Sequence, residues 1–421
     1  MRKGLERGIT PPRVTLRSLP ELIGNQLADD PTKTPVYQAV FASLPSSIPA
    51  AEQARLREAA RRAIAERATP VLRALQRFVR EEYLPKARES LALSALPDGA
   101  AWYAYDARRS TTTTLTPDEI HRIGLDEVAR IDGEMQRVVK EVGWRGTLAE
   151  FFTFLRTDKR FFHGAREALL VGYRDIAKRI DPELPRLFGV LPRLPYGVAA
   201  VPAHSERSQP TAFYQGGSTE LGRAGMFLAN TYDLGARPTW EMEALTLHEA
   251  VPGHHLQIQI AAELGELPKF RRYGGYNAFV EGWGLYAESL GAELGLYTDP
   301  YARFGQLVYE MWRAIRLVLD TGIHAKGWNR EQAIRFFREH SGKSEHDITV
   351  EVDRYIVWPG QALGYKIGQL RIRAQRTEAE RAFAQRGQRF DVRGFHDVVL
   401  GAGALPLTVL ESRVRDWLRT R

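Results

Sequence analysis

Apolar residues recur at helical spacing along most of the chain. Residues 50–90 carry alanine, leucine and arginine at intervals of three and four around Pro70, which indicates a helical hairpin or a kinked helix. Thr-x-x-Glu capping boxes begin the helices expected over residues 117–142 and 148–155. The same periodicity predicts further helices at residues 165–180, 240–264, 277–296, 301–323, 330–340 and 350–374, the last with a break at Pro359-Gly360.

Two regions break this helical pattern. The first fifty residues are rich in proline and small polar residues, which predicts an extended lead-in with little helix. Residues 189–232 combine prolines and glycines with short β-favouring runs at 196–201, 212–215 and 226–232, which predict a small sheet. Without an internal repeat or a long linker, the pattern predicts one mainly α-helical domain. Its expected parts are a helical region at residues 1–188, a strand region at 189–232 and a second helical region at 233–421.

Composition narrows the chemistry that this domain can perform. The 421 residues include no cysteine, so disulfides and thiolate metal sites are excluded, and any metal must be held by His, Asp or Glu. The net charge of +8 is spread along the chain without a basic block, so no nucleic-acid partner is expected. There is no apolar run long enough for membrane insertion and no signal peptide in this chain. We therefore expect a cytoplasmic location by default, and export if the natural N-terminus is longer.

A cluster of histidines points to a metal site. His248, His254 and His255 fall within eight residues, and Glu249 directly follows the first of them. In helices of the His-Glu-x-x-His kind, two histidines one turn apart bind zinc and the glutamate activates water. Here the position one turn after His248 is Pro252, which cannot bind a metal and must deform the helix. A two-residue bulge would bring His254 to the second ligand position, and a three-residue bulge would bring His255.

The third ligand is expected on the next predicted helix. Glu281 lies among apolar and small residues, where an unpaired carboxylate is costly. Glu288 is seven residues later and shares the same helical face. We therefore expect Glu281 to bind the metal and Glu288 to orient one of the histidines.

Five runs in the chain are similar to runs of one known family: His248 to Gln257, Val280 to Glu288, Asp320 to His324, Arg354-Tyr355 with Pro359 to Lys366, and Phe395 to Asp397. They resemble the bacterial family catalogued as domain of unknown function 885, whose members are usually longer at the N-terminus. That family is similar to the gluzincin metallopeptidases, which include the thimet oligopeptidase, angiotensin-converting enzyme and carboxypeptidase Taq groups. The resemblance implies a large helical gluzincin-like metallopeptidase domain with a small β-sheet next to the metal-binding helix.

The same resemblance implies roles for single residues. It favours His254 over His255 as the second ligand and makes Glu281 the third. A tyrosine from a late helix donates a hydrogen bond to the reacting carbonyl in the related peptidases, and Tyr365 resembles that position best, with Tyr355 in reserve. Strand residues 222–232 would offer a sheet edge to an extended substrate. The sequence itself, apart from the resemblance, singles out His324, which follows a Thr-Gly break at the end of a long apolar helix and would contact the substrate or its oxyanion, or else cap its helix.

Together these features predict a zinc metallopeptidase. His248, His254 and Glu281 would hold Zn²⁺, and Glu249 would act as the general base toward a metal-activated water that attacks a peptide bond. The expected partner is therefore a peptide or a small amide substrate. Two alternatives stay open: a metal-dependent amidase or esterase with a small non-peptide substrate, and a catalytically inactive metal-binding protein. Glu249 argues against the inactive protein, because a purely structural zinc needs no general base.

Overall fold

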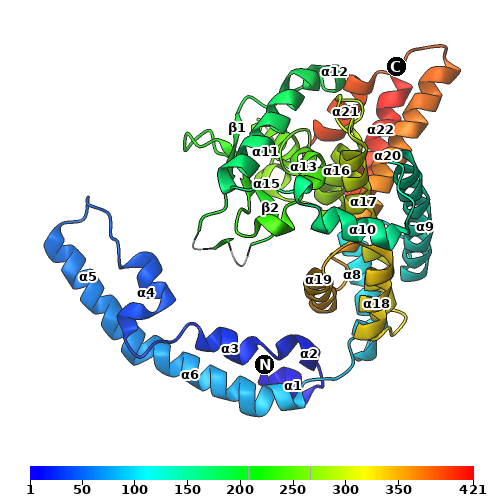
Figure 1. Cartoon of the computed structure of the whole chain (residues 1–421). Helices are drawn as coiled ribbons and strands as arrows, with labels where there is room; N and C mark the ends of the chain where they lie inside the picture. The colour runs from blue at the N-terminus through cyan, green and yellow to red at the C-terminus, as the bar shows by residue number, and fades with distance from the viewer. Residues whose placement is uncertain (204, 207–208, 266) are drawn as a thin grey trace. The chain divides into compact units, whose positions relative to one another are not determined.

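The computed structural model describes residues 1–203, 205–206, 209–265 and 267–421. They form two compact units, Met1–Asp98 and Gly99–Arg421. Both are built mainly of helices (Figure 1), and 66% of the chain is helical, which confirms the mainly α-helical prediction. The sequence indicated no boundary near Asp98, and a single domain over residues 1–421 stays a prediction. None of the helices in the described ranges is both long and apolar enough to span a membrane.

The first unit corrects the expectation of an extended lead-in. Its first fifty residues contain short helices: α1 (Arg2–Glu6), α2 (Arg13–Leu16), α3 (Leu19–Gly24), η1 (Pro31–Lys33) and α4 (Pro35–Val40). Proline lies in the first turn of α3, η1 and α4. The first N–H groups of a helix have no partner within it, so proline can begin a helix there without losing a hydrogen bond. The prolines of this region therefore start helices where we expected them to prevent helices.

Residues 50–86 form one continuous helical run in place of a hairpin. The run contains α5 (Ala50–Ala63), the π-helical turn η2 (Ile64–Ala68), α6 (Thr69–Phe78), a second π turn η3 (Val79–Tyr83) and α7 (Leu84–Lys86). Pro70 and Pro85 each lie at the second position of the helical segment that follows a π turn. The wider turn accommodates the missing N–H and the proline ring without ending the helix. Of the two structures expected here, the hairpin is wrong, and the chain forms a single helical run with two π turns, drawn as a curved run in Figure 1.

The second unit is organised around α17 (Pro300–His324), which is buried along almost its whole C-terminal half. Against it pack α9 (Pro117–Glu141), α13 (Met242–Glu249) and α20 (Leu363–Gln385). The capping boxes at Thr116 and Thr147 are both present. The other helices of the unit are α8 (Gly99–Thr111), α10 (Leu148–Thr157), α11 (Arg166–Ile180), α12 (Leu184–Leu187), α14 (His254–Glu263), α15 (Lys269–Tyr273), α16 (Asn277–Ser289), α18 (Arg330–His340), α19 (Glu345–Val357), α21 (Val392–Leu400) and α22 (Leu407–Arg419).

Two predicted helices differ from the observed ones. The helix expected over residues 240–264 is divided into α13 and α14, and the helix expected to reach residue 296 ends at Ser289. The break predicted at Pro359-Gly360 is confirmed, since α19 ends at Val357 and α20 begins at Leu363.

Helices α16 and α20 cross at an unusually short distance because two glycines meet at the crossing. A Cβ atom on Gly368 would lie 1.9 Å from the carbonyl oxygen of Ala278. A Cβ atom on Gly282 would lie 2.5 Å from the Cα atom of Gly368. Glycine is therefore required at both positions for the backbones to approach this closely, and the crossing fixes the position of α16.

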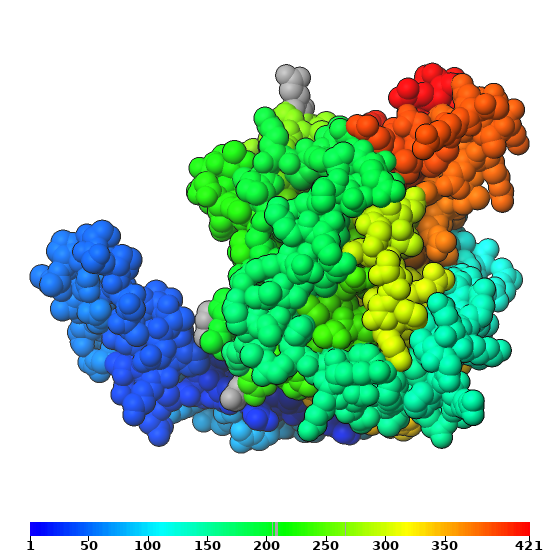
Figure 2. All heavy atoms as spheres, turned by 45° about the horizontal axis from the view of Figure 1, so that its top comes forward, coloured from blue at the N-terminus to red at the C-terminus, as the bar shows by residue number. Residues whose placement is uncertain are grey.

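The small sheet confirms the three predicted strands and corrects the expected role of one. Strand β3 (Gly225–Ala229) lies in the centre, parallel to β1 (Tyr196–Ala200) and antiparallel to β2 (Ala212–Gln215). Both edges of β3 are therefore paired, so the expectation that residues 222–232 offer an edge to a substrate is wrong. Helix α13 packs against β2 and α14 against β3, so the sheet adjoins both histidine-bearing helices. The space-filling view shows this strand region, in green, on one face of the unit (Figure 2).

Candidate metal centre

The histidine-bearing helix is interrupted completely at the position of Pro252. Helix α13 ends at Glu249, and α14 begins at His254. At Ala250 the backbone leaves the helical region, with φ −96° and ψ −111°, and the peptide bond between Val251 and Pro252 is cis. Proline has no N–H and its ring clashes with the preceding helical turn, so a deformation of the helix was expected here. The observed break is four residues long and replaces the bulge that we predicted.

Two contacts hold this break in place. The indole Nε1 of Trp283, on α16, donates a hydrogen bond to the carbonyl oxygen of Pro252 over 2.8 Å. A Cβ atom on Gly253 would lie 1.9 Å from the carbonyl oxygen of His248, so only glycine allows the chain to pass so close to the end of α13. The backbone between the two histidines is therefore set by packing against α13 and α16.

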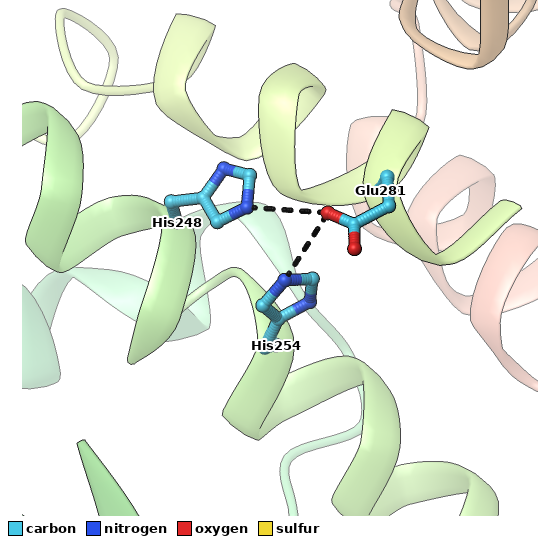
Figure 3. Close-up of side chains that lie close together, drawn as sticks. All are labelled: His248, His254 and Glu281. Carbon is cyan, nitrogen blue, oxygen red and sulfur yellow. Dashed lines mark ion pairs between the residues drawn. The ribbon is translucent and has the colours of Figure 1, made fainter. Parts of the chain in front are cut away.

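The break brings His248 and His254 together with Glu281 (Figure 3). Nε2 of each histidine lies 3.6 Å from Oε2 of Glu281, and one donor atom from each side chain falls within 4.8 Å of the others. Ligand atoms bound to a tetrahedral zinc ion at about 2.0–2.2 Å lie about 3.3 Å from one another. Two imidazole nitrogens and one carboxylate oxygen therefore lie close to the spacing of zinc ligands and could hold a divalent ion once the side chains move inward.

Glu288 orients His248 as the sequence suggested. Nδ1 of His248 donates a hydrogen bond to Oε1 of Glu288 over 2.7 Å, and this carboxylate is fully buried. The bond leaves Nε2 as the nitrogen that faces Glu281. Gly284 makes room for the ring, because a Cβ atom there would lie 2.7 Å from its Cε1 atom. A buried carboxylate behind a ligating histidine typically fixes the ring and makes it a better donor.

Opposing effects act on the protonation of this cluster in the absence of an ion. Burial lowers the pKa of His248, but its contacts with Glu281 and Glu288 outweigh burial and raise the pKa to about 9. Burial raises the pKa of Glu281, whereas His248 and His254 lower it by more, so the pKa ends well below its usual value. The carboxylate is therefore charged at neutral pH and attracts a cation.

His255, the alternative second ligand, is turned away from the cluster. Its Nδ1 atom lies 2.9 Å from the hydroxyl of Tyr214, and its ring packs 4.7 Å from the ring of Tyr196. Burial lowers its pKa to about 4. The structure therefore brings His254 to the candidate centre and holds His255 against the sheet.

The cluster opens onto a cavity of about 450 Å³ within the second unit. Glu249 and Tyr365 also line this cavity. Tyr355 does not: its buried hydroxyl donates to Glu351 over 2.7 Å. His324 is fully buried at the end of α17, and its Nε2 atom lies 2.9 Å from the carbonyl oxygen of Tyr355. Of the three residues proposed to contact substrate beside Glu249, the structure brings only Tyr365 to the cavity.

Three arginines in the cavity wall were not identified from the sequence. Arg313 and Arg316 come from α17 and Arg354 comes from α19. The available signal was the run Arg313-Ala-Ile-Arg316, which places two cations one turn apart inside an otherwise apolar helix. That signal indicates buried and paired arginines, but their position in the wall of this cavity depends on the tertiary fold.

Comparisons with known proteins agree with this architecture. The profile of the family described as bacterial protein of unknown function (DUF885) matches residues 1–414. A crystal structure of a candidate lipoprotein from Colwellia psychrerythraea is similar over 100% of this chain and 72% of its own, with 33% identity and a TM-score of 0.93. A candidate lipoprotein of unknown function from Shewanella oneidensis shares the fold, with 20% identity, a TM-score of 0.68 and coverage of 94% of this chain and 76% of its own. The search of curated proteins gave no match. The chain belongs to the bacterial DUF885 family of proteins of unknown function.

Proposed function

We propose that this protein is a zinc-dependent hydrolase of the gluzincin type that cleaves peptide bonds. One observation carries the proposal: two histidines and a glutamate converge at ligand spacing in a cavity that Glu249 also lines. Three protein ligands leave one coordination position open, which is typical of catalytic zinc and not of structural zinc. A zinc ion held by these side chains would polarise a substrate carbonyl and make water more acidic.

Glu249 and Tyr365 would carry out proton transfer and stabilise the developing negative charge. Glu249 follows the ligand His248 directly, and its carboxylate would take a proton from the attacking water and deliver it to the leaving amine. Tyr365 would donate its hydroxyl hydrogen to the substrate oxygen that gains negative charge. Its ring packs 4.5 Å from the guanidinium of Arg316, which would keep the side chain in place.

The position of β2 favours a peptide over a small non-peptide amide. Residues 210–214, which include most of β2, line the cavity, and within the described residues β2 pairs only with β3. Its other edge therefore offers backbone N–H and C=O groups to an extended chain, as in peptide recognition by strand addition. This edge takes the role that we expected of residues 222–232.

The comparison with the Colwellia psychrerythraea protein also bears on location. That protein is described as a candidate lipoprotein, which supports an exported site of action for this one. Recovery of the protein from the cell envelope fraction would agree with this proposal, and recovery from the cytosol alone would contradict it.

Cleavage of a peptide library by zinc-loaded protein tests the proposed function. The Glu249→Gln variant should keep its zinc and lose about 10²–10⁴-fold in rate, since it lacks the general base. Glu378→Gln, the same change at an exposed position on α20, serves as the control and should cleave at the rate of the unchanged protein. Cleavage that survives Glu249→Gln would refute the mechanism. Activity toward small amides or esters in the absence of peptide cleavage would favour the alternative substrate class.

A further inference from the structure

One wall of the cavity is rich in positive charge. Arg313, Arg316 and Arg354 all line it, and the first two are almost completely buried, with 6% and 3% of their surfaces exposed. Burial of an arginine costs free energy unless its charge is paired. The hydrogen-bond and ion-pair partners of each guanidinium therefore determine how much of it is left to bind a ligand. We refer to these three residues as the arginine wall.

Arg316 lies at the centre of the arginine wall. Its Nε atom donates to the hydroxyl of Tyr355 over 3.1 Å, and its Nη2 atom donates to Glu351 over 3.1 Å. Its guanidinium also packs 4.6 Å from the ring of Trp312. The remaining nitrogen, Nη1, is buried and has no hydrogen-bond partner among the described residues. The group is therefore held rigidly while part of its donor capacity is unused.

The other two arginines are also incompletely paired. Nη2 of Arg313 is 3.6 Å from Glu288, and its buried Nε atom has no hydrogen-bond partner in the part of the chain that the structure describes. Arg354 keeps 34% of its side chain exposed, donates to the neutral Gln361 over 3.1 Å and lies 3.5 Å from Glu351. Three cations thus face two carboxylates, and one of these, Glu288, already accepts a hydrogen bond from His248.

We propose that the arginine wall binds a carboxylate group of the ligand, and that this group is the free C-terminal carboxylate of a short peptide. The excess of one positive charge and the unused guanidinium donors suit an anion with planar oxygens. Oε1 of Glu288 contacts both Arg313 and His248, so the wall begins beside the candidate metal centre. The bound carboxylate would therefore share the cavity with the candidate metal centre. The identification of the ligand as a peptide rests on the proposed function.

Binding to an inactive protein tests this inference without relying on turnover. Zinc-loaded Glu249→Gln protein is titrated calorimetrically with N-acetyl-trialanine, with its C-terminal amide, and with N-acetyl-Ala-Asp-Ala amide. The free acid should bind about tenfold more tightly than its amide, as expected for one additional hydrogen bond to a charged group. Equal affinities, or no binding of the acid, would overturn the inference. Preference for the aspartyl amide over the acid would overturn the assignment to the C-terminus.

Substitutions locate the preference in the arginine wall. Arg354→Gln should remove most of the tenfold preference for the acid and leave the affinity for the amide unchanged. The matched control is Arg330→Gln, because Arg330 is paired with Asp353 beside Arg354 but does not line the cavity. A preference retained in Arg354→Gln, or lost equally in Arg330→Gln, would contradict the assignment. If the acid is preferred but the unchanged protein cleaves no peptide, only the proposed function fails.

Discussion

Gly284→Ala should weaken metal binding without changing any residue that could bind the metal. The added Cβ atom would meet the imidazole of His248 at 2.7 Å from Cε1, 2.9 Å from Nε2 and 3.0 Å from Nδ1. Carbon atoms pack at about 3.5–4.0 Å, so the ring must move by roughly 0.8–1.3 Å. Metal sites tolerate about 0.2 Å in ligand distance. The shift also strains the bond to Glu288, whose role as an orienting partner is worth about 10–100-fold in affinity. We therefore expect Gly284→Ala to lower the affinity for zinc by about 10–100-fold.

The assay is competition for zinc between the protein and a chromophoric chelator, together with thermal unfolding. Overpacking at this position should also cost about 1–3 kcal/mol of stability. The control is Gly133→Ala on α9, where a Cβ atom meets nothing within 4 Å. That variant should bind zinc normally and gain up to about 1 kcal/mol from helix propensity. A folded Gly284→Ala protein with the zinc affinity of the control would refute the reasoning that Gly284 positions His248.

Other predictions follow from the same geometry. Glu288→Gln should lower zinc affinity about 10–100-fold, and an unchanged affinity would mean that Glu288 does not support His248. Gly253→Ala should abolish zinc binding or folding, because its Cβ atom would overlap a carbonyl oxygen at 1.9 Å; normal zinc affinity would contradict the described break. Gly368→Ala should lower the midpoint of thermal unfolding by forcing α16 and α20 apart, and an unchanged midpoint would contradict the close crossing. Zinc affinity should rise from pH 6 to pH 9, because His248, with a pKa of about 9, must lose its proton to bind metal; a constant affinity would contradict this.

A rise in pH should change the stability of the metal-free fold and the affinity for zinc in opposite directions. In the metal-free protein the pKa of His248 is raised from 6.5 to about 9 by its two carboxylate contacts. These contacts therefore stabilise the fold fully below pH 6.5, and their contribution is lost as the pH rises through 9. Zinc reverses the trend, because it competes with the proton for the same nitrogen. Unfolding curves with and without zinc between pH 6 and pH 9 would separate the two effects.

The sequence predicted site residues best where a polar or charged residue lies among apolar neighbours. His248, Glu281 and Glu288 are polar residues on otherwise apolar helices, and burial of such groups demands partners. Pro252 predicted that the helix deforms, but it could not determine the path of the four-residue break between α13 and α14. Whether His254 or His255 meets Glu281 depends on that path, which is fixed by Trp283 and by the absence of a side chain at Gly253.

Long-range packing explains most of the features that the sequence did not predict. The resemblance favours Tyr365 and keeps Tyr355 in reserve, and the packing of α17, α19 and α20 places Tyr365 in the cavity and bonds Tyr355 to Glu351. Strand order in the sheet is likewise non-local, since β3 inserts between β1 and β2. The short helices before residue 50 were missed because proline was interpreted as a breaker at positions where it begins helices.

The zinc content of the purified protein and three variants tests the central claim most directly. The claim predicts about one zinc per chain, lost in His248→Ala and in Glu281→Ala and retained in Glu249→Gln, whose carboxylate is not expected to bind the metal. Retention of zinc by both ligand variants, or failure of the unchanged protein to bind zinc at micromolar concentration, would contradict the assignment of His248, His254 and Glu281 as a metal centre.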